Sequence, residues 1–188
     1  MKFDLQKQGV MQRRDNSKKG AVDKEVAKLL SIINSKNNYY STSSCSGRIM
    51  LLKLSKTGRK DHSDWLLSSH QPIAFSKIKA ALKELPEEEV WFRSEPFIAH
   101  IACRTLDDAK HYIGICNTAG FKHSGIIALS RRIIVESYGS DFIDAIVSKN
   151  KKLLCDESYL KVLLSAANKK LKSNMEKIKR LEELAKGL

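Results

Sequence analysis

A run of small polar side chains lies near the middle of the N-terminal half of the chain, and Arg48 follows it directly. The run consists of Ser43, Ser44, Cys45, Ser46 and Gly47. Small residues at the end of a strand leave backbone N–H groups accessible, and consecutive N–H groups can form a nest for a carboxylate or a phosphate. Arg48 would add a guanidinium that grips such an anion through two parallel hydrogen bonds. The pattern predicts an anion-binding turn, with an ordinary hairpin turn as the alternative.

Three later residues have side chains that suit acid–base chemistry, namely His70, Glu95 and His100. An imidazole or a carboxylate can serve as a general base, although a histidine in a strand is more often structural. The same trio could ligate iron as two histidines and one carboxylate, but no further oxygenase signature accompanies it, so we expect no metal. A hydrolase would pair Cys45 or a serine of the run with one of the histidines, but the sequence contains no nucleophile elbow.

Charge and composition narrow the class of protein. The chain of 188 residues has 34 basic and 21 acidic side chains, a net charge of +13. The surplus lies toward both ends and in the 48–60 segment, which favours a polyanionic partner such as nucleic acid. The nine glycines form no GxGxxG motif, which argues against a Rossmann dinucleotide or methyltransferase site, and P-loop, HExxH and EF-hand motifs are also absent.

The chain contains no segment typical of a membrane or secreted protein. The longest stretch without Lys, Arg, Asp or Glu is Trp65–Ser76, which is too short to span a bilayer, and residues 1–20 lack the apolar centre of a signal peptide. No two of the cysteines form a CxxC pair, and we expect Cys103, Cys116 and Cys155 to be reduced core thiols. The sequence therefore predicts a soluble, cytoplasmic protein.

Apolar periodicity indicates the elements that position these residues. It predicts helices over 22–34, 75–85 and 106–116, the last ending at Gly120, and a long amphipathic helix over about 157–186. Strands are expected over 39–42, 48–54, 65–70, 90–93, 97–103, 126–129 and 131–136, with a last hairpin from 142–147 and 152–154. The 43–47 run would be the turn of a hairpin between the first two strands. From Trp65 the order β-α-β-β-α-β is that of a ferredoxin-like unit. We expect one α+β domain over 1–188 with a largely antiparallel sheet.

Several ordered motifs together resemble a known family. They are Asp15–Asp23, Thr42–Ile49, Trp65–His70, Phe92–His100 and Gly120–Ile126. This set closely resembles the tRNA wybutosine-synthesizing protein 3 family, particularly its stand-alone archaeal-type members. The resemblance runs from about Phe3 to the C-terminal helix. The Ser-Ser-Cys-Ser-Gly-Arg run, together with Glu-Pro-Phe and the histidine that follows, makes it specific.

The resemblance implies an S-adenosyl-L-methionine-dependent methyltransferase with a fold outside the doubly wound class. Its substrate would be the tricyclic guanosine derivative at position 37, just 3′ of the anticodon of tRNA-Phe, and the methyl acceptor would be the ring nitrogen N4. That nitrogen must lose a proton before or during attack, so a base is needed. The candidates are His100, His70 and Glu95. The target lies in a single-stranded loop, where splaying out a base costs less than in a duplex.

The remaining candidates would bind cofactor or tRNA. We expect cofactor contacts from Ser43, Ser44, Cys45, Ser46, Gly47, Trp65, Ser124 and Gly125, with Trp65 stacking on the adenine or on the tricyclic base. We expect tRNA contacts from Lys19, Arg48, Lys56, Arg59 and Lys60. The alternative function is a non-catalytic basic RNA-binding module. The enzymatic reading requires the 43–48 run and the two histidine-bearing strands to meet in one cleft with positive surface around it.

Overall fold

The computed structural model describes residues 2–12, 22–54 and 64–188. Four of the predicted tRNA contacts, Lys19, Lys56, Arg59 and Lys60, lie outside these residues. The helices are α1 (Lys2–Met11), α2 (Lys24–Ser35), α3 (Phe75–Ala81), α4 (Leu106–Ala119) and α5 (Glu157–Ala185). The strands are β1 (Tyr39–Cys45), β2 (Arg48–Lys53), β3 (Asp64–Ser69), β4 (Val90–Glu95), β5 (Ile98–Cys103), β6 (Gly125–Ala128), β7 (Ile133–Tyr138), β8 (Ile143–Lys149) and β9 (Lys152–Leu153). No described helix is long and apolar enough to cross a membrane.

The chain packs as two compact units. The first unit comprises Met1–Ser46, Phe97–Ser140 and Met175–Leu188, and the second comprises Gly47–Pro96 and Asp141–Asn174. The predicted C-terminal helix is confirmed as α5, which contributes its N-terminal part to the second unit and its C-terminal part to the first. One domain over 1–188 stays a prediction.

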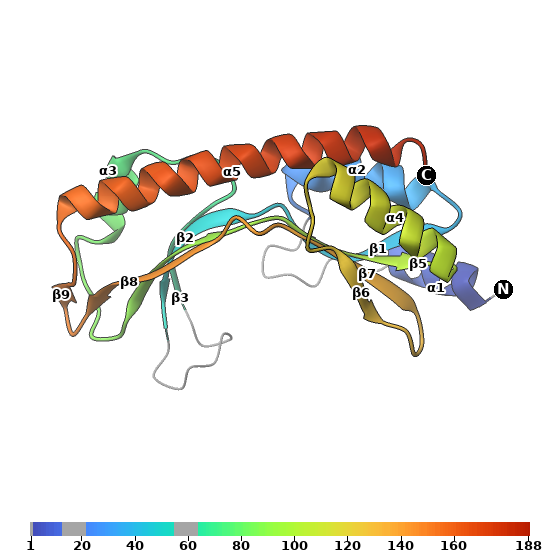
Figure 1. Cartoon of the computed structure of the whole chain (residues 1–188). Coiled ribbons are helices and arrows are strands. Elements are labelled where there is room, and N and C mark those ends of the chain that lie inside the picture. The colour runs from blue at the N-terminus through green and yellow to red at the C-terminus, as the bar shows by residue number, and fades with distance from the viewer. Residues whose placement is uncertain (1, 13–21, 55–63) are drawn as a thin grey trace. The chain divides into compact units, whose positions relative to one another are not determined.

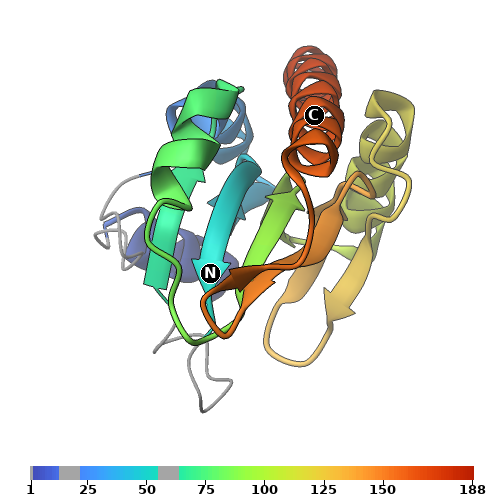
Figure 2. The same ribbon diagram turned by 90° about the vertical axis from the view of Figure 1, so that its left-hand side faces the viewer.

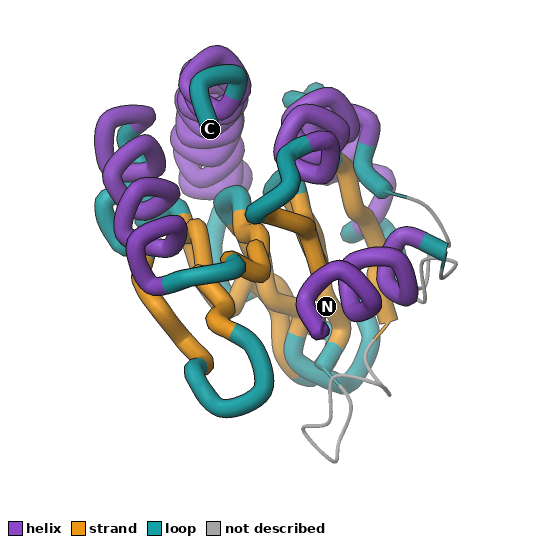
Figure 3. Tube along the Cα trace, turned by 90° about the vertical axis from the view of Figure 1, so that its right-hand side faces the viewer, coloured by secondary structure: helices purple, strands orange, loops and turns teal. Residues whose placement is uncertain are grey.

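The first unit is built on an antiparallel sheet with the strand order β1-β5-β7-β6. Helices α2 and α4 lie over one face of this sheet, together with the last turns of α5 (Figures 1 and 3). Alternate residues of β5, namely Ala99, Ile101 and Cys103, point into the core beneath these helices and are at most 2% exposed. Because side chains alternate across a strand, the intervening residues of β5 face away from the core helices.

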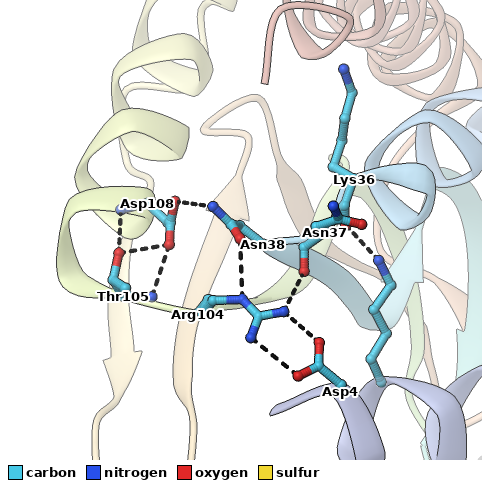
Figure 4. Close-up of polar contacts among 8 residues, drawn as sticks. Asp4, Lys36, Asn37, Asn38, Arg104, Thr105 and Asp108 are labelled. Atoms are coloured by element: carbon cyan, nitrogen blue, oxygen red, sulfur yellow. Dashed lines mark hydrogen bonds and ion pairs between the residues drawn. The ribbon is translucent and has the colours of Figure 1, made fainter. Parts of the chain in front are cut away.

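Helix α1 lies outside the predicted helices, because its sequence has no apolar stripe. None of its residues is buried. Tertiary contacts hold it instead. The ring of Phe3 lies 5.0 Å from that of Tyr40, and the terminal nitrogens of Arg104 donate to the Asp4 carboxylate at 3.3 and 2.5 Å (Figure 4). These hydrogen bonds hold the pKa of Asp4 well below its usual range. Arg104 also donates to the side chain of Asn38 at 3.1 Å, which links α1 to the start of β1.

Helix α4 begins and ends with standard capping contacts. Thr105 and Asp108 form a capping box in which each side chain bonds the other's backbone N–H, as Figure 4 shows. Gly120 closes the helix in the left-handed conformation, with φ of 105°, which glycine adopts without steric cost. The predicted helix and its glycine cap are confirmed.

The second unit is built on a five-stranded antiparallel sheet with the order β3-β2-β4-β8-β9. Helix α3 and the first part of α5 lie over one face of it (Figures 1 and 2). Leu51, Phe92 and Val147 point toward these helices and are fully buried. The predicted β8–β9 hairpin is confirmed, and its turn places Asn150 and Lys151 at φ of 51° and 57°.

Two predictions about strand pairing are corrected. The segments 39–45 and 48–53 do not form a hairpin, since β1 pairs with β5 while β2 pairs with β3 and β4. The predicted turn is largely strand, because Ser43–Cys45 extend β1. The elements β3-α3-β4-β5-α4-β6 do occur in the predicted order, but β3 and β4 belong to one sheet and β5 and β6 to the other. The described strands thus form two antiparallel sheets of an α+β fold rather than one ferredoxin-like sheet.

Candidate active site

One residue from each strand of the first unit's sheet lines up in a single row. Ser43 of β1 pairs with His100 of β5, His100 pairs with Glu136 of β7, and Glu136 pairs with Gly125 of β6. Paired residues of an antiparallel sheet point to the same face. Three predicted site residues, Ser43, His100 and Gly125, are therefore brought together, although they come from distant parts of the chain.

A bulge in β1 decides which way Ser43 points. Ser41 pairs with Ile101 and accepts a hydrogen bond from Asn34 of α2 at 3.1 Å, so it faces the core helices. In a regular strand Ser43 would share that face. The register shifts between Ser41 and Ser43, and the extra residue turns Ser43 onto the face of His100.

Hydrogen bonds join the row into a triad. The Ser43 hydroxyl lies 2.9 Å from Nδ1 of His100, and Nε2 of His100 lies 2.8 Å from a carboxylate oxygen of Glu136. An ionised carboxylate can only accept, so Nε2 carries a proton and donates a hydrogen bond to Glu136. In the neutral imidazole Nδ1 is then the acceptor, and the Ser43 hydroxyl donates a hydrogen bond to it. This arrangement polarises a hydroxyl through an imidazole that a carboxylate orients, as in hydrolytic triads.

The triad is open to solvent. The side chains of His100 and Glu136 are each 30% exposed, and their neighbours on the opposite face, Ile101 and Val135, are fully buried. A Cβ added at Gly125 would meet no atom within 4 Å, so space lies beside the row. A substrate or cofactor can therefore reach these groups.

Sequence reasoning missed Glu136. Its strand alternates, with Val135 buried and Ser137 bonded within the core to Tyr112 at 2.9 Å, so the period of two could have placed Glu136 on the open face. The pairing of β5 with β7, which brings Glu136 to His100, has no local signal in the sequence.

The rest of the polar run is largely occupied by contacts within the protein. Asp23, just before α2, accepts hydrogen bonds from the backbone N–H of Ser46 at 2.9 Å and from its hydroxyl at 3.1 Å. Ser46 is only 2% exposed, so this part of the predicted anion site binds a carboxylate of the chain itself. Ser44 pairs with Ala99 and so shares the helix-facing side, whereas Cys45 pairs with Ile98 on the side of the triad.

Further predicted site residues lie in the second unit, whose first residue is Gly47. His70 follows β3, and its Nδ1 donates to the carbonyl oxygen of Gly47 at 2.8 Å, which fixes the proton on Nδ1. Arg48 donates through Nε to Glu95 at 3.0 Å, and its guanidinium lies 4.7 Å from the centre of the Trp65 ring. Trp65 lies in β3, where a strand is predicted, and is 46% exposed. The meeting of His70 and Glu95 with the His100 site stays a prediction, because they belong to different units.

Ser124 completes the set of predicted residues in the first unit. Its hydroxyl donates to the carbonyl oxygen of Phe121 at 2.7 Å in the turn between α4 and β6. The turn delivers Gly125 to the start of β6. Ser124 thus has a local structural contact, and its predicted role toward a cofactor stays a prediction.

The cysteines divide into two classes, which gives a testable difference in reactivity. Cys103 and Cys116 are buried, and burial raises the pKa of Cys103 to about 12 and also raises that of Cys116. Cys45 and Cys155 are half-buried. The thiolate is the reactive form, so we expect an aromatic disulfide reagent at pH 8 to modify Cys45 and Cys155 in the native protein. Cys103 and Cys116 should react only after unfolding in denaturant.

Peptide mass spectrometry after timed quenching would assign each modified thiol. Native modification of Cys103 or Cys116 at the rate of Cys155 would contradict the packing of the first core. Cys155 itself, expected in the core, is only partly buried because it lies in the exposed link between β9 and α5.

Comparison with known proteins places this geometry in context. The family model described as "Methyltransferase TYW3" matches residues 4–186. A tRNA(Phe) 7-((3-amino-3-carboxypropyl)-4-demethylwyosine(37)-N(4))-methyltransferase 1 of Pyrococcus furiosus is 34% identical over 88% of this chain and 85% of its own length. The mouse tRNA wybutosine-synthesizing protein 3 homolog is 36% identical over 90% of this chain and 67% of its own. The solved structure of the PH1069 protein from Pyrococcus horikoshii superposes with a TM-score of 0.89 at 31% identity, over 98% of this chain and 96% of that one.

Proposed function

This chain belongs to the methyltransferase TYW3 family, and we propose that it methylates N4 of a 4-demethylwyosine nucleotide at position 37 of tRNA(Phe). In this proposal Ser43, His100 and Glu136 handle the proton that the reaction releases. The observation that carries the proposal is the pair of hydrogen bonds, at 2.9 and 2.8 Å, that places His100 between a hydroxyl and a carboxylate.

The methyl donor in this proposal is S-adenosylmethionine, which would supply, when bound, a methyl group on a positively charged sulfur. The row suits a cationic donor, because it combines the Glu136 carboxylate with an exposed hydroxyl at Ser43 and free space at Gly125. Ser43, Cys45 and Gly125 are the predicted cofactor contacts that share this face. Of the other predicted contacts in this unit, Ser44 faces the helices and Ser46 bonds Asp23.

The reaction forms a bond from N4 to carbon and breaks the bond from that carbon to sulfur, while N4 loses its proton. The proton passes to Nδ1 of His100, through the Ser43 hydroxyl or directly once that hydroxyl turns aside. Glu136 accepts from Nε2 and stabilises the imidazolium that forms. Removing the proton as the bond forms keeps the product nitrogen neutral. Holding acceptor and donor in line contributes the rest of the acceleration.

The other two candidates make different contacts, within the second unit. His70 donates from Nδ1 to the Gly47 carbonyl oxygen, and Glu95 accepts from Arg48. Neither contact joins a hydroxyl, an imidazole and a carboxylate as the contacts of His100 do. We assign the proton transfer to His100 for this reason.

Transfer of labelled methyl groups from S-adenosylmethionine to purified tRNA tests the assignment. We expect label at position 37 of tRNA(Phe) that carries the demethylated tricyclic nucleotide, and none in the same tRNA with an unmodified guanosine, which lacks the acceptor ring. Binding of S-adenosylmethionine would be followed by calorimetry on the same protein. Intact protein that binds this tRNA, but neither binds the donor nor transfers label, would instead support a non-catalytic RNA-binding module.

A further inference from the structure

Both tryptophans of the chain lie on the same face of the second unit's sheet. Leu52 of β2 pairs with Trp65 of β3 on one side and with Trp91 of β4 on the other. Trp91 in turn pairs with Ile146 of β8. Leu51, which precedes Leu52, points into the core under α3 and α5, so this row lies on the face that those helices leave uncovered.

The outer residues of this row, Trp65 and Ile146, expose apolar surface, and Leu52 between the two tryptophans is buried. Trp65 is 46% and Ile146 38% exposed, whereas Leu52 is only 5% exposed. The two indoles therefore flank a covered leucine rather than standing as isolated surface residues. Trp91 is half-buried, and its indole N–H donates to the Glu89 carboxylate at 3.1 Å. An exposed aromatic side chain grouped with other apolar residues on one face marks an interaction surface more often than scattered apolar residues do.

An arginine accompanies each tryptophan. The guanidinium carbon of Arg48 lies 4.7 Å from the Trp65 ring centre, and that of Arg93 lies 5.2 Å from the Trp91 ring centre. A carboxylate holds each arginine through Nε: Glu95 bonds Arg48 at 3.0 Å, and Asp144 bonds Arg93 at 2.8 Å. These bonds hold each guanidinium beside its ring through Nε, and they leave the N–H groups of the terminal nitrogens for other acceptors.

We propose that this face, formed by Trp65, Trp91, Arg48 and Arg93, is a platform on which unpaired RNA bases stack. Single-stranded bases stack on indole rings and on guanidinium planes. The stacking energy depends little on which base is bound, because every base has a flat aromatic face. The platform deepens the proposed function and rests on it, since position 37 lies in the single-stranded anticodon loop of the tRNA substrate.

The net charge of the whole chain and its proposed substrate favour RNA over a protein partner at this face. The chain has a net charge of +13 and acts on a polyanion. The local ion pairs neutralise the two arginines, so the face offers stacking and N–H donors to bases rather than a strong field for phosphates. Paired RNA conceals its base faces, and the platform therefore discriminates single-stranded RNA from duplex RNA.

The native fluorescence of the chain provides the test, because its two tryptophans are both in the platform. The full-length protein would be titrated with the seven-nucleotide anticodon-loop RNA, and separately with the same RNA annealed to its complement at equal phosphate concentration. We expect saturable quenching by the single strand and little by the duplex. Trp65→Phe and Trp91→Phe variants would each leave one indole and show whether both are quenched.

Affinity variants separate stacking from general binding. Trp65→Ala is expected to raise the Kd for the loop RNA about tenfold, while Trp65→Phe, which keeps a ring, stays near the wild-type value. Tyr159→Ala is the matched control, because Tyr159 is an equally exposed aromatic residue, 48% exposed, on α5 of the same unit. Unchanged thermal unfolding would show that each variant is folded.

Three fluorescence results would each overturn the platform: quenching by the duplex equal to that by the single strand, no quenching by either RNA, or fluorescence that depends on protein concentration without RNA, which would point to protein contact. Methyl transfer that proceeds without any effect of Trp65→Ala or Trp91→Ala on RNA affinity removes the platform and leaves the proposed function intact. Quenching by single strands in a protein that transfers no methyl group would support the platform and overturn the proposed function.

Discussion

Replacement of His100 by alanine is expected to slow methyl transfer in a single turnover by about a hundredfold or more, the range over which a general base contributes. His100 accepts from the Ser43 hydroxyl and donates to Glu136, so its loss removes the proton acceptor and separates the two groups that flank it. Saturating S-adenosylmethionine and substrate tRNA would be mixed with excess enzyme and quenched at intervals. Kd values for both ligands should change little.

The neighbouring residues distinguish a base from a structural histidine. Glu136→Gln keeps the size of the side chain but removes the charge that favours the imidazolium, so we expect a smaller loss of rate than for His100→Ala. Ser43→Ala should cost less than His100→Ala, because a water molecule can replace a relay hydroxyl. Cys45→Ala should be tolerated better than His100→Ala.

Opposite results have distinct meanings. A His100→Ala variant with the wild-type rate would remove the triad from the mechanism. A Ser43→Ala variant as slow as His100→Ala would make Ser43 more than a relay and revive covalent chemistry at this hydroxyl. Normal binding of tRNA and cofactor by each variant is the necessary control, since a slow rate then reports the chemical step.

Replacement of Gly47 by alanine is expected to lower the free energy of unfolding by about 3 kcal/mol, near the upper end for strain at one backbone position. Gly47 has φ of 89°, which L residues rarely adopt. A Cβ at this position would lie 2.7 Å from the carbonyl oxygen of Glu95 and 2.9 Å from the carbonyl carbon of Pro96. Both are backbone atoms, which cannot rotate aside as a flexible side chain can.

Urea unfolding followed by circular dichroism would measure this loss. Gly114→Ala is the matched control: Gly114 lies within α4, a Cβ there meets nothing within 4 Å, and alanine favours helix by up to about 1 kcal/mol. We expect that variant to be as stable as the wild type or more so. Equal stability of Gly47→Ala and the wild type would mean that the chain at Gly47 adopts another conformation.

Local patterns in the sequence were enough to predict the positions of several elements. The apolar stripe of α5 and the Gly120 cap of α4 depend on contacts within a few residues, so their positions are close to those predicted. Helix α1 has no such stripe and depends on distant partners such as Arg104, and no local signal indicates it. The 43–47 run has turn-like composition, yet it continues β1 because β5 offers it a partner.

The candidate site shows the same division. Residue type and the family resemblance together selected His100 as a candidate base and Ser43 and Gly125 as candidate cofactor contacts. Ser43 and His100 are 57 positions apart, and His100 and Glu136 are 36 apart, so their contacts depend on which strands pair and in which register. Register is set by the packing of whole strand faces against helices, not by any short segment.

The sequence by itself determined the basic charge, the family, most helices and two of the three triad side chains, Ser43 and His100, because each of these is a property of composition or of neighbours along the chain. The tertiary structure alone decided that a bulge at Thr42 turns Ser43 toward His100, that Glu136 completes the triad, and that Trp65 and Trp91 share one open face. A one-residue shift in pairing reverses the face of every side chain that follows. Only the packed sheet fixes that choice.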